Sequence, residues 1–142
     1  MKLSWTSLKI SIAGAKLSHL VQKDKIWDHG SMAEQARIIF YLVHKARSTA
    51  NIESLKKHCS VSCFEKLKTM MEEKTGNVCL NDPIIKGLAV LEVQPGKANR
   101  PDMFTALIRG ISKDGMNQNE IEFSIHWSFV RQGEWWMLDK IK

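Results

Sequence analysis

The sequence has too few cysteines, and in the wrong pattern, for a disulfide framework. Cys59, Cys63 and Cys79 are odd in number, which favours a reducing compartment of the cytoplasmic or mitochondrial-matrix kind. Cys59 and Cys63 are four residues apart with His58 adjacent, a spacing that raises the question of zinc. Zinc usually takes four ligands from two paired clusters, and the sequence offers no second cluster. We therefore expect no metal and no cofactor.

Long apolar runs are also missing. No stretch reaches the roughly 20 apolar residues that span a bilayer, because Lys9 and Lys16 interrupt the apolar region near the N-terminus. The first 23 residues contain no acid, and residues 1–70 have a net charge of +7 whereas residues 71–142 have −1. This asymmetry favours an acidic partner, such as a phospholipid, a nucleic acid or an acidic protein surface. The alternative is a solvated lysine surface without a partner.

The basic N-terminal segment, residues 1–25, has the spacing of an amphipathic helix from about Thr6 to Gln22. Three interpretations remain open. In the first, its apolar side packs on the rest of the protein. In the second, it lies at a membrane interface, where lysines and an indole are favoured. In the third, it is an organelle-targeting segment, since such segments are basic and poor in acids.

Helical patterns continue to about residue 76. A capping box at Ser31–Glu34 predicts a helix from Met32 to Arg47. Asn51 is expected to cap a short helix through Lys57. A second capping box, residues 62–65, predicts another helix that ends near Gly76.

Strand patterns follow at Ile84–Ile85 and Leu88–Val93, then at Met103–Ile111, Glu120–Arg131 and Trp135–Ile141. Turn signals separate the later strands, Asp114-Gly115 before the third and Gly133 before the last. The order predicts an α+β fold in which N-terminal helices pack on a four-stranded antiparallel sheet.

Alternation in the long strand from 120 to 131 separates an apolar face from a polar one. Phe123, Ile125, Trp127 and Phe129 share one face and are expected to point inward. His126 then points outward, away from any enclosed site and without an orienting acid, so we expect no catalytic role for it. Trp135 and Trp136 are adjacent and must point to opposite faces of the strand. One indole can join the core, and the other is expected at the rim of the sheet or in contact with a partner.

The pattern Trp127-x-Phe129-x-Arg131 followed by Trp136-x-Leu138-x-x-Ile141 resembles the closing hairpin of the Tim forty-four-like domain family. That family belongs to the nuclear-transport-factor-two-like cone superfamily. Upstream segments agree in order: Trp27, the helix around residues 37–40, Leu55, the 60–67 segment and Asp102-x-Phe104, so the resemblance covers residues 26–142. The family often has an acid shortly before the first tryptophan, and Ile125-His126 occupy that place here.

The resemblance implies a strongly curved sheet, a cone-shaped α+β barrel that encloses an apolar pocket. It also implies a non-enzymatic scaffold, peripheral to a membrane, that tethers a protein partner or anionic lipid. The expected residues fall into three groups: membrane-binding Lys2, Trp5, Lys9, Lys16 and Lys23; pocket-lining Phe40, Phe123, Ile125, Trp127, Phe129 and Trp136; and partner-binding Trp135 and His126.

Other functions stay open as alternatives. The main alternative is a protein that binds a small apolar ligand, or an enzyme, in the cone pocket, because the superfamily includes isomerases and dehydratases. Asp102 and Tyr41 are the only acid–base candidates that we place near its mouth, and neither has a partner visible in the sequence. Binding to DNA is not expected, because aromatic residues are not interleaved with the lysines. The protein partner is unidentified and homodimerisation is left open.

Overall fold

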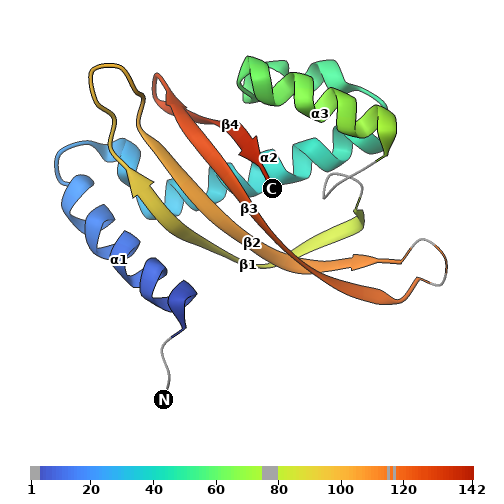
Figure 1. Ribbon diagram of the computed structural model, residues 1–142, viewed down its shortest axis with the longest axis horizontal. Coiled ribbons are helices and arrows are strands. Elements are labelled where there is room, and N and C mark those ends of the chain that lie inside the picture. The colour runs from blue at the N-terminus through green and yellow to red at the C-terminus, as the bar shows by residue number, and fades with distance from the viewer. Residues whose placement is uncertain (1–3, 75–79, 115, 117) are drawn as a thin grey trace.

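Helices form the first half of the chain and strands the second half, as predicted. The computed structural model describes residues 4–74, 80–114, 116 and 118–142 (Figure 1). Its helical elements are α1 (Trp5–Leu20), η1 (Lys25–Trp27), α2 (His29–Ser48), η2 (Ile52–His58) and α3 (Val61–Glu73), where η denotes a 3-10 helix. Its strands are β1 (Asn81–Gln94), β2 (Met103–Lys113), β3 (Glu120–Gln132) and β4 (Trp135–Ile141). The predicted α+β class is therefore confirmed.

The four strands form one antiparallel sheet in the order β1-β2-β3-β4. Ala106 on β2 pairs with Trp127 on β3, and Trp127 pairs with Ile141 on β4. Because β1 and β4 lie at opposite edges, the sheet stays open, and the expected closed barrel is wrong. Closure requires the first and last strands to pair, with a tilt and stagger that fit the strand number.

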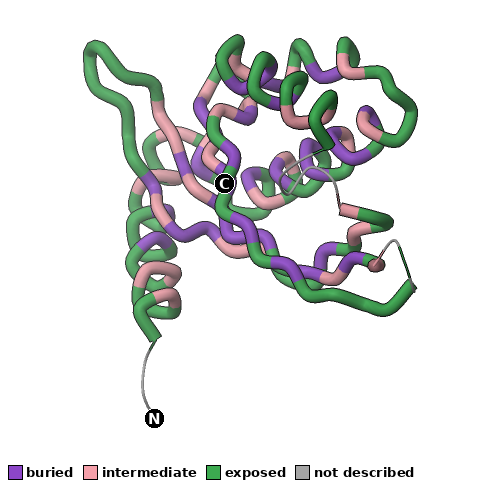
Figure 2. Tube along the Cα trace, turned by 45° about the vertical axis from the view of Figure 1, so that its right-hand side comes forward, coloured by how far each residue is buried: buried purple, intermediate pink, exposed green. Residues whose placement is uncertain are grey.

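Helices α2 and α3 lie together on one side of the sheet, and α1 lies along β1 (Figure 1). Buried residues of these helices and of the sheet form one core. Figure 2 marks the buried positions along the chain. Ala13 and Leu17 of α1 belong to this core and are 2% and 3% exposed. The N-terminal helix thus packs on the fold, and the predicted boundary between residues 25 and 26 falls inside η1.

Both predicted capping boxes place the helix start too late. Asp28 accepts a hydrogen bond from the Ser31 backbone N–H at 2.8 Å, so α2 begins at His29. Ser60 accepts one from the Cys63 backbone N–H at 3.3 Å, so α3 begins at Val61. In each case a better-placed polar side chain lies two or three residues upstream of the predicted cap and satisfies the free amides of the first turn.

The remaining boundaries differ little from expectation. Element η2 is the predicted short helix, although the Asn51 side chain makes no capping hydrogen bond. The helix expected to end near Gly76 ends at Glu73, with Lys74 in the left-handed conformation; Gly76 itself lies outside the described residues, as does Gly115 of the predicted turn. The segments 84–85 and 88–93 are parts of one continuous strand, β1. Gly133 has a φ of 64° in the tight turn between β3 and β4, a conformation that favours glycine.

Candidate functional site

Helix α1 has an apolar stripe that the fold does not cover. Trp5, Leu8 and Ile12 are 71%, 40% and 48% exposed. Their spacing of three and then four residues places them on one side of the helix. Ala13 and Leu17 lie on the buried side, so packing does not require the stripe. An indole held at the surface next to lysines is typical of an interface with a membrane or a partner.

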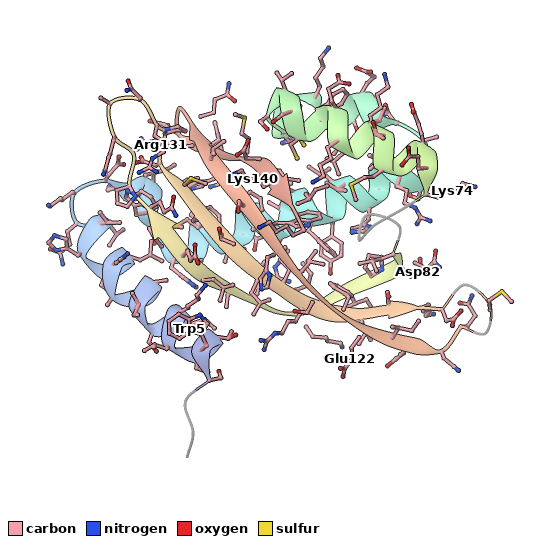
Figure 3. The ribbon with its side chains drawn as sticks, viewed as in Figure 1. Trp5, Lys74, Asp82, Glu122, Arg131 and Lys140 are labelled. Carbon is pink, nitrogen blue, oxygen red and sulfur yellow. The ribbon has the colours of Figure 1, made fainter. Side chains whose placement is uncertain are left out.

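Lys9 connects this stripe to the sheet. Its ammonium forms an ion pair with Glu92 of β1, with Nζ and Oε1 2.8 Å apart. The same Nζ lies 5.9 Å from the centroid of the Trp5 ring, within range of a cation–π attraction. Trp5 lies near the N-terminal end of α1 (Figure 3). Lys9 therefore fixes one side of α1 against β1 and stabilises the orientation of the exposed indole.

A basic hollow of about 500 Å³ lies next to α1, on the face of the sheet opposite the core. Its lining residues come from α1, all four strands, the segment before β2 and the residue after β4: Lys9, Leu91, Glu92, Gln94, Arg100, Met103, Thr105, His126, Ser128, Lys140 and Lys142. The hydroxyls of Thr105 and Ser128 are 3.0 Å apart and form part of its polar lining. Four cationic side chains line the hollow, and Glu92, its single lining acid, is paired with Lys9. Convergent cations of this kind attract an anion.

The stripe and the hollow belong to one surface. A smaller hollow of about 170 Å³ between α1 and β1 is lined in part by Ile12 and Lys16. It shares Lys9, Leu91, Glu92 and Gln94 with the basic hollow. We call the combined surface the basic face. Its members are the half-buried Lys9 and the exposed Trp5, Leu8, Ile12, Lys16, Arg100, His126, Lys140 and Lys142. It presents apolar side chains beside a field of positive charge.

The predicted membrane-binding residues are partly brought together by this arrangement. Trp5, Lys9 and Lys16 lie on α1 and belong to the basic face. Lys23 is exposed but lies beyond the end of α1, and Lys2 lies outside the described residues. Sequence reasoning missed Arg100, Lys140 and Lys142, which join the face only through the fold. Strand alternation from the buried Trp136 and Leu138 would place Lys140 inward, and only the register shift between Ser128 and Phe129 of the β3–β4 pairing turns it outward, so no local sequence signal could have identified it.

The predicted pocket residues pack against one another in the core. The Phe40 ring is stacked on Phe123 at 5.8 Å and lies 5.5 Å from Trp127. Trp136 makes an edge contact with Phe104 at 4.8 Å. Ile125 and Phe129 are 1% and 0% exposed. Trp136 forms the floor of a groove beside α2, and the other residues of this group line none of the four main hollows among the described residues.

The two predicted partner-binding residues lie in different places. His126 is exposed and lines the basic hollow. Trp135 is 70% exposed and lines the separate groove beside α2. Trp136 is 3% exposed, so alternation distributes the tryptophan pair as expected, one indole inside and one outside. His126 and Trp135 therefore do not belong to a single partner-binding surface.

The acid–base candidates near the expected mouth have structural partners. Asp102 forms an ion pair with Arg131, with Oδ2 and Nη1 3.1 Å apart, and the Tyr41 hydroxyl accepts a hydrogen bond from the Ile85 N–H at 3.0 Å. No partner for either residue was visible in the sequence, and the fold supplies one for each. Both residues hold elements together.

Buried polar groups in the core were not identified from the sequence. Both ring nitrogens of His44 and the indole nitrogen of Trp127 are buried without a hydrogen-bond partner among the described residues. Burial, and secondarily the charge of Arg47, lowers the pKa of His44 to about 4, so its ring is neutral near pH 7. His44 lies one turn after Phe40 on α2, and its ring is 4.5 Å from that ring. Its position four residues after Phe40 on a helix is the sequence signal that could have identified His44 as buried.

Cys59 and Cys63 are buried free thiols in the described part of the chain. A hydrogen bond between them, reinforced by burial, raises the pKa of Cys63 far above the usual range and keeps its thiol protonated. Cys79 lies outside the described residues. Among the residues that the structure describes, no group of three or more His, Cys, Asp or Glu side chains is arranged to hold a metal ion.

Comparison with known protein families gives no matching family, and a search of curated proteins gives no matching sequence.

Proposed function

We propose that this protein is a non-enzymatic docking domain that binds an anionic membrane surface through its basic face. The observation that carries the proposal is the exposed indole of Trp5, in line with Leu8 and Ile12 on a helix whose other side is already packed. No helix in the described part of the chain is long and apolar enough to cross a bilayer. Contact from one side is therefore the form of membrane binding that these helices support.

Charge and apolar area act together in this proposal. Each lysine or arginine close to an anionic leaflet contributes about 1 kcal/mol, and the contribution decreases with salt. Lys9 and Lys16 lie beside the stripe, while Arg100, Lys140 and Lys142 extend the positive field across the sheet. The indole then enters the interfacial region, where an amphipathic ring is favoured. Binding of this kind is reversible and salt-sensitive.

The opposite side of the molecule remains available for tethering a protein partner. A membrane-peripheral scaffold is also what the resemblance to the Tim forty-four-like domain family implies, and that resemblance stays a prediction. We place no catalytic step in the protein, because the inward aromatic residues fill the core and Asp102 is paired with Arg131.

Sedimentation with liposomes tests the proposal. The protein should pellet with vesicles of phosphatidylcholine and phosphatidylserine at low salt, and should be released at high salt or from phosphatidylcholine alone. Trp5→Ala should weaken binding about tenfold, since burial of a large apolar side chain contributes about 1.5–3 kcal/mol. Trp135→Ala is the matched control, because Trp135 is equally exposed, at 70% against 71%, but lies outside the basic face. Failure to pellet at low salt, or equal losses in both variants, would refute the proposal.

A further inference from the structure

A groove of about 650 Å³, separate from the basic face, lies between α2, η2 and the β3–β4 hairpin. Its lining residues are Gln35, Ile38, Ile39, Lys57, His58, Gln132, Gly133, Trp135, Trp136 and Met137. The volume falls within the range of about 300–1,000 Å³ that is usual for small-molecule sites. None of the residues named for the basic face lines this groove.

The floor of the groove is fixed by hydrogen bonds. The Trp136 backbone N–H donates to Oε1 of Gln35 at 3.0 Å, which joins β4 to α2. The indole N–H of Trp136 donates to the carbonyl of Ile26 at 3.2 Å, and the ring contacts Trp27 at 5.2 Å. A floor held in this way is formed before any ligand arrives, so binding requires little reorganisation.

The walls are apolar and open. Ile38 from α2 and Trp135 from β4 are 48% and 70% exposed, and Met137 is half-buried. An apolar body placed between Ile38 and Trp135 would remove these side chains from water, which is favourable by about 25 cal/mol for each Å² of apolar area buried.

Positive charge lies on the η2 side of the groove. Lys57 is exposed and His58 is partly buried, and none of the ten lining residues is an acid. Neither residue forms an ion pair in the described part of the chain. Burial, and then the charge of Lys57, lowers the pKa of His58, as expected for a ring that has no anionic neighbour to stabilise its charged form. An anionic group fits this position, and a second cation does not.

We propose that this groove binds an amphipathic monoanion, that is, an apolar chain or ring system with one carboxylate or sulfonate group. The apolar body lies between Ile38 and Trp135, over the Trp136 floor. The anionic group lies against Lys57 and His58. This proposal does not depend on the membrane-docking function, because the two surfaces share no lining residue.

Calorimetry with two probes of opposite charge tests the proposal. Dodecanoate should bind with a stoichiometry of one, and dodecyltrimethylammonium, which has the same chain and the opposite charge, should not. Ile38→Glu and Lys57→Glu should each weaken dodecanoate binding at least about tenfold, since each places a carboxylate beside the ligand. Ile121→Glu and Lys68→Glu are matched controls, because Ile121 is 47% exposed on β3 and Lys68 is exposed on α3. Both controls should bind dodecanoate as the unmodified protein does.

Three results would overturn the proposal. One is the absence of dodecanoate binding in a protein whose circular dichroism is native. Another is equal binding of the two probes, which would exclude recognition of the anion. The last is a dimer, detected by sedimentation velocity, that Ile38→Glu dissociates while dodecanoate has no effect, because the groove would then be a contact between copies. The Ile38 and Lys57 variants should still pellet with anionic liposomes, so failure here is distinguishable from failure of the docking function.

Discussion

Arg131 on β3 forms an ion pair with Asp24, which lies 107 positions earlier, with Nη1 and Oδ2 2.6 Å apart. Asp24 also caps η1 by accepting a hydrogen bond from the Ile26 N–H. The same guanidinium pairs with Asp102 just before β2. One side chain therefore links the segment that follows α1 to β3 and to the segment before β2. Arg131 is labelled in Figure 3. This link, together with Lys9–Glu92, sets how α1 presents the basic face.

Asp24→Asn should lower the melting temperature and increase amide hydrogen exchange in α1. The hydrogen bond from Arg131, followed by that from the Ile26 N–H, lowers the pKa of Asp24 below its ordinary value of 3.8. A carboxyl with a lowered pKa contributes stability above its ordinary pKa and loses it as the pH falls through the lowered value. The difference between the variant and the unmodified protein should thus be present at pH 7 and shrink below about pH 3.8.

Glu34→Gln is the control for this experiment. Glu34 pairs with Arg37 at 3.8 Å within α2 and both side chains are well exposed, so its loss should have little effect. Equal destabilisation by the two variants would contradict a special role for the Arg131–Asp24 pair.

His44 should make the fold less stable in mild acid. Its pKa is about 4 in the folded protein and 6.5 ordinarily, so the unfolded chain binds a proton that the folded chain excludes between these values. The free energy of unfolding should therefore fall as the pH decreases from 6.5 to 4, by about 3 kcal/mol in total. Urea denaturation across this range measures the slope.

His44→Phe should flatten that slope, because it removes the titrating ring from the core and leaves a side chain that needs no hydrogen bond. His29→Phe, at an exposed position, should leave the slope unchanged. The prediction is wrong if both variants keep the pH dependence of the unmodified protein.

Gly110→Ala should destabilise the sheet by about 1–3 kcal/mol. A methyl group at this position would collide with the carbonyl oxygen of Ile84 and approach Cζ of Phe123 to 2.8 Å. Gly87→Ala, on the neighbouring strand, meets nothing within 4 Å and should be tolerated. Urea denaturation of the two variants compares a close backbone approach with an open position in the same β1–β2 ladder.

Charge reversal at Lys140 and Lys142 should weaken binding to anionic liposomes and reduce its dependence on salt. Both residues line the basic hollow, and each reversal replaces attraction to the leaflet by repulsion. The double variant Lys66→Glu/Lys68→Glu on α3 has the same net charge and should bind nearly as well as the unmodified protein. Equal losses in the two double variants would mean that net charge, and not the basic face, determines binding.

Much of the fold could be predicted from local pattern. The alternation from Phe123 to Phe129 depends only on the two-residue period of a strand, and it identified the inward face. The first residue of α2 and of α3 could not be predicted in the same way, because several polar side chains near Asp28 and Ser60 compete to cap the first turn and only the folded backbone selects one.

The sequence by itself determined the order of helices and strands, the buried row on β3 and the separation of Trp135 from Trp136, because these follow from periodicity and turn chemistry. Only the tertiary structure decided that the sheet stays open and that Lys9, Arg100 and Lys140 meet around one hollow. It also buried the unpartnered ring of His44 beside Phe40. These features depend on contacts between segments that are distant in the sequence. The packing of whole helices and strands sets the geometry of such contacts, and no local sequence pattern encodes it.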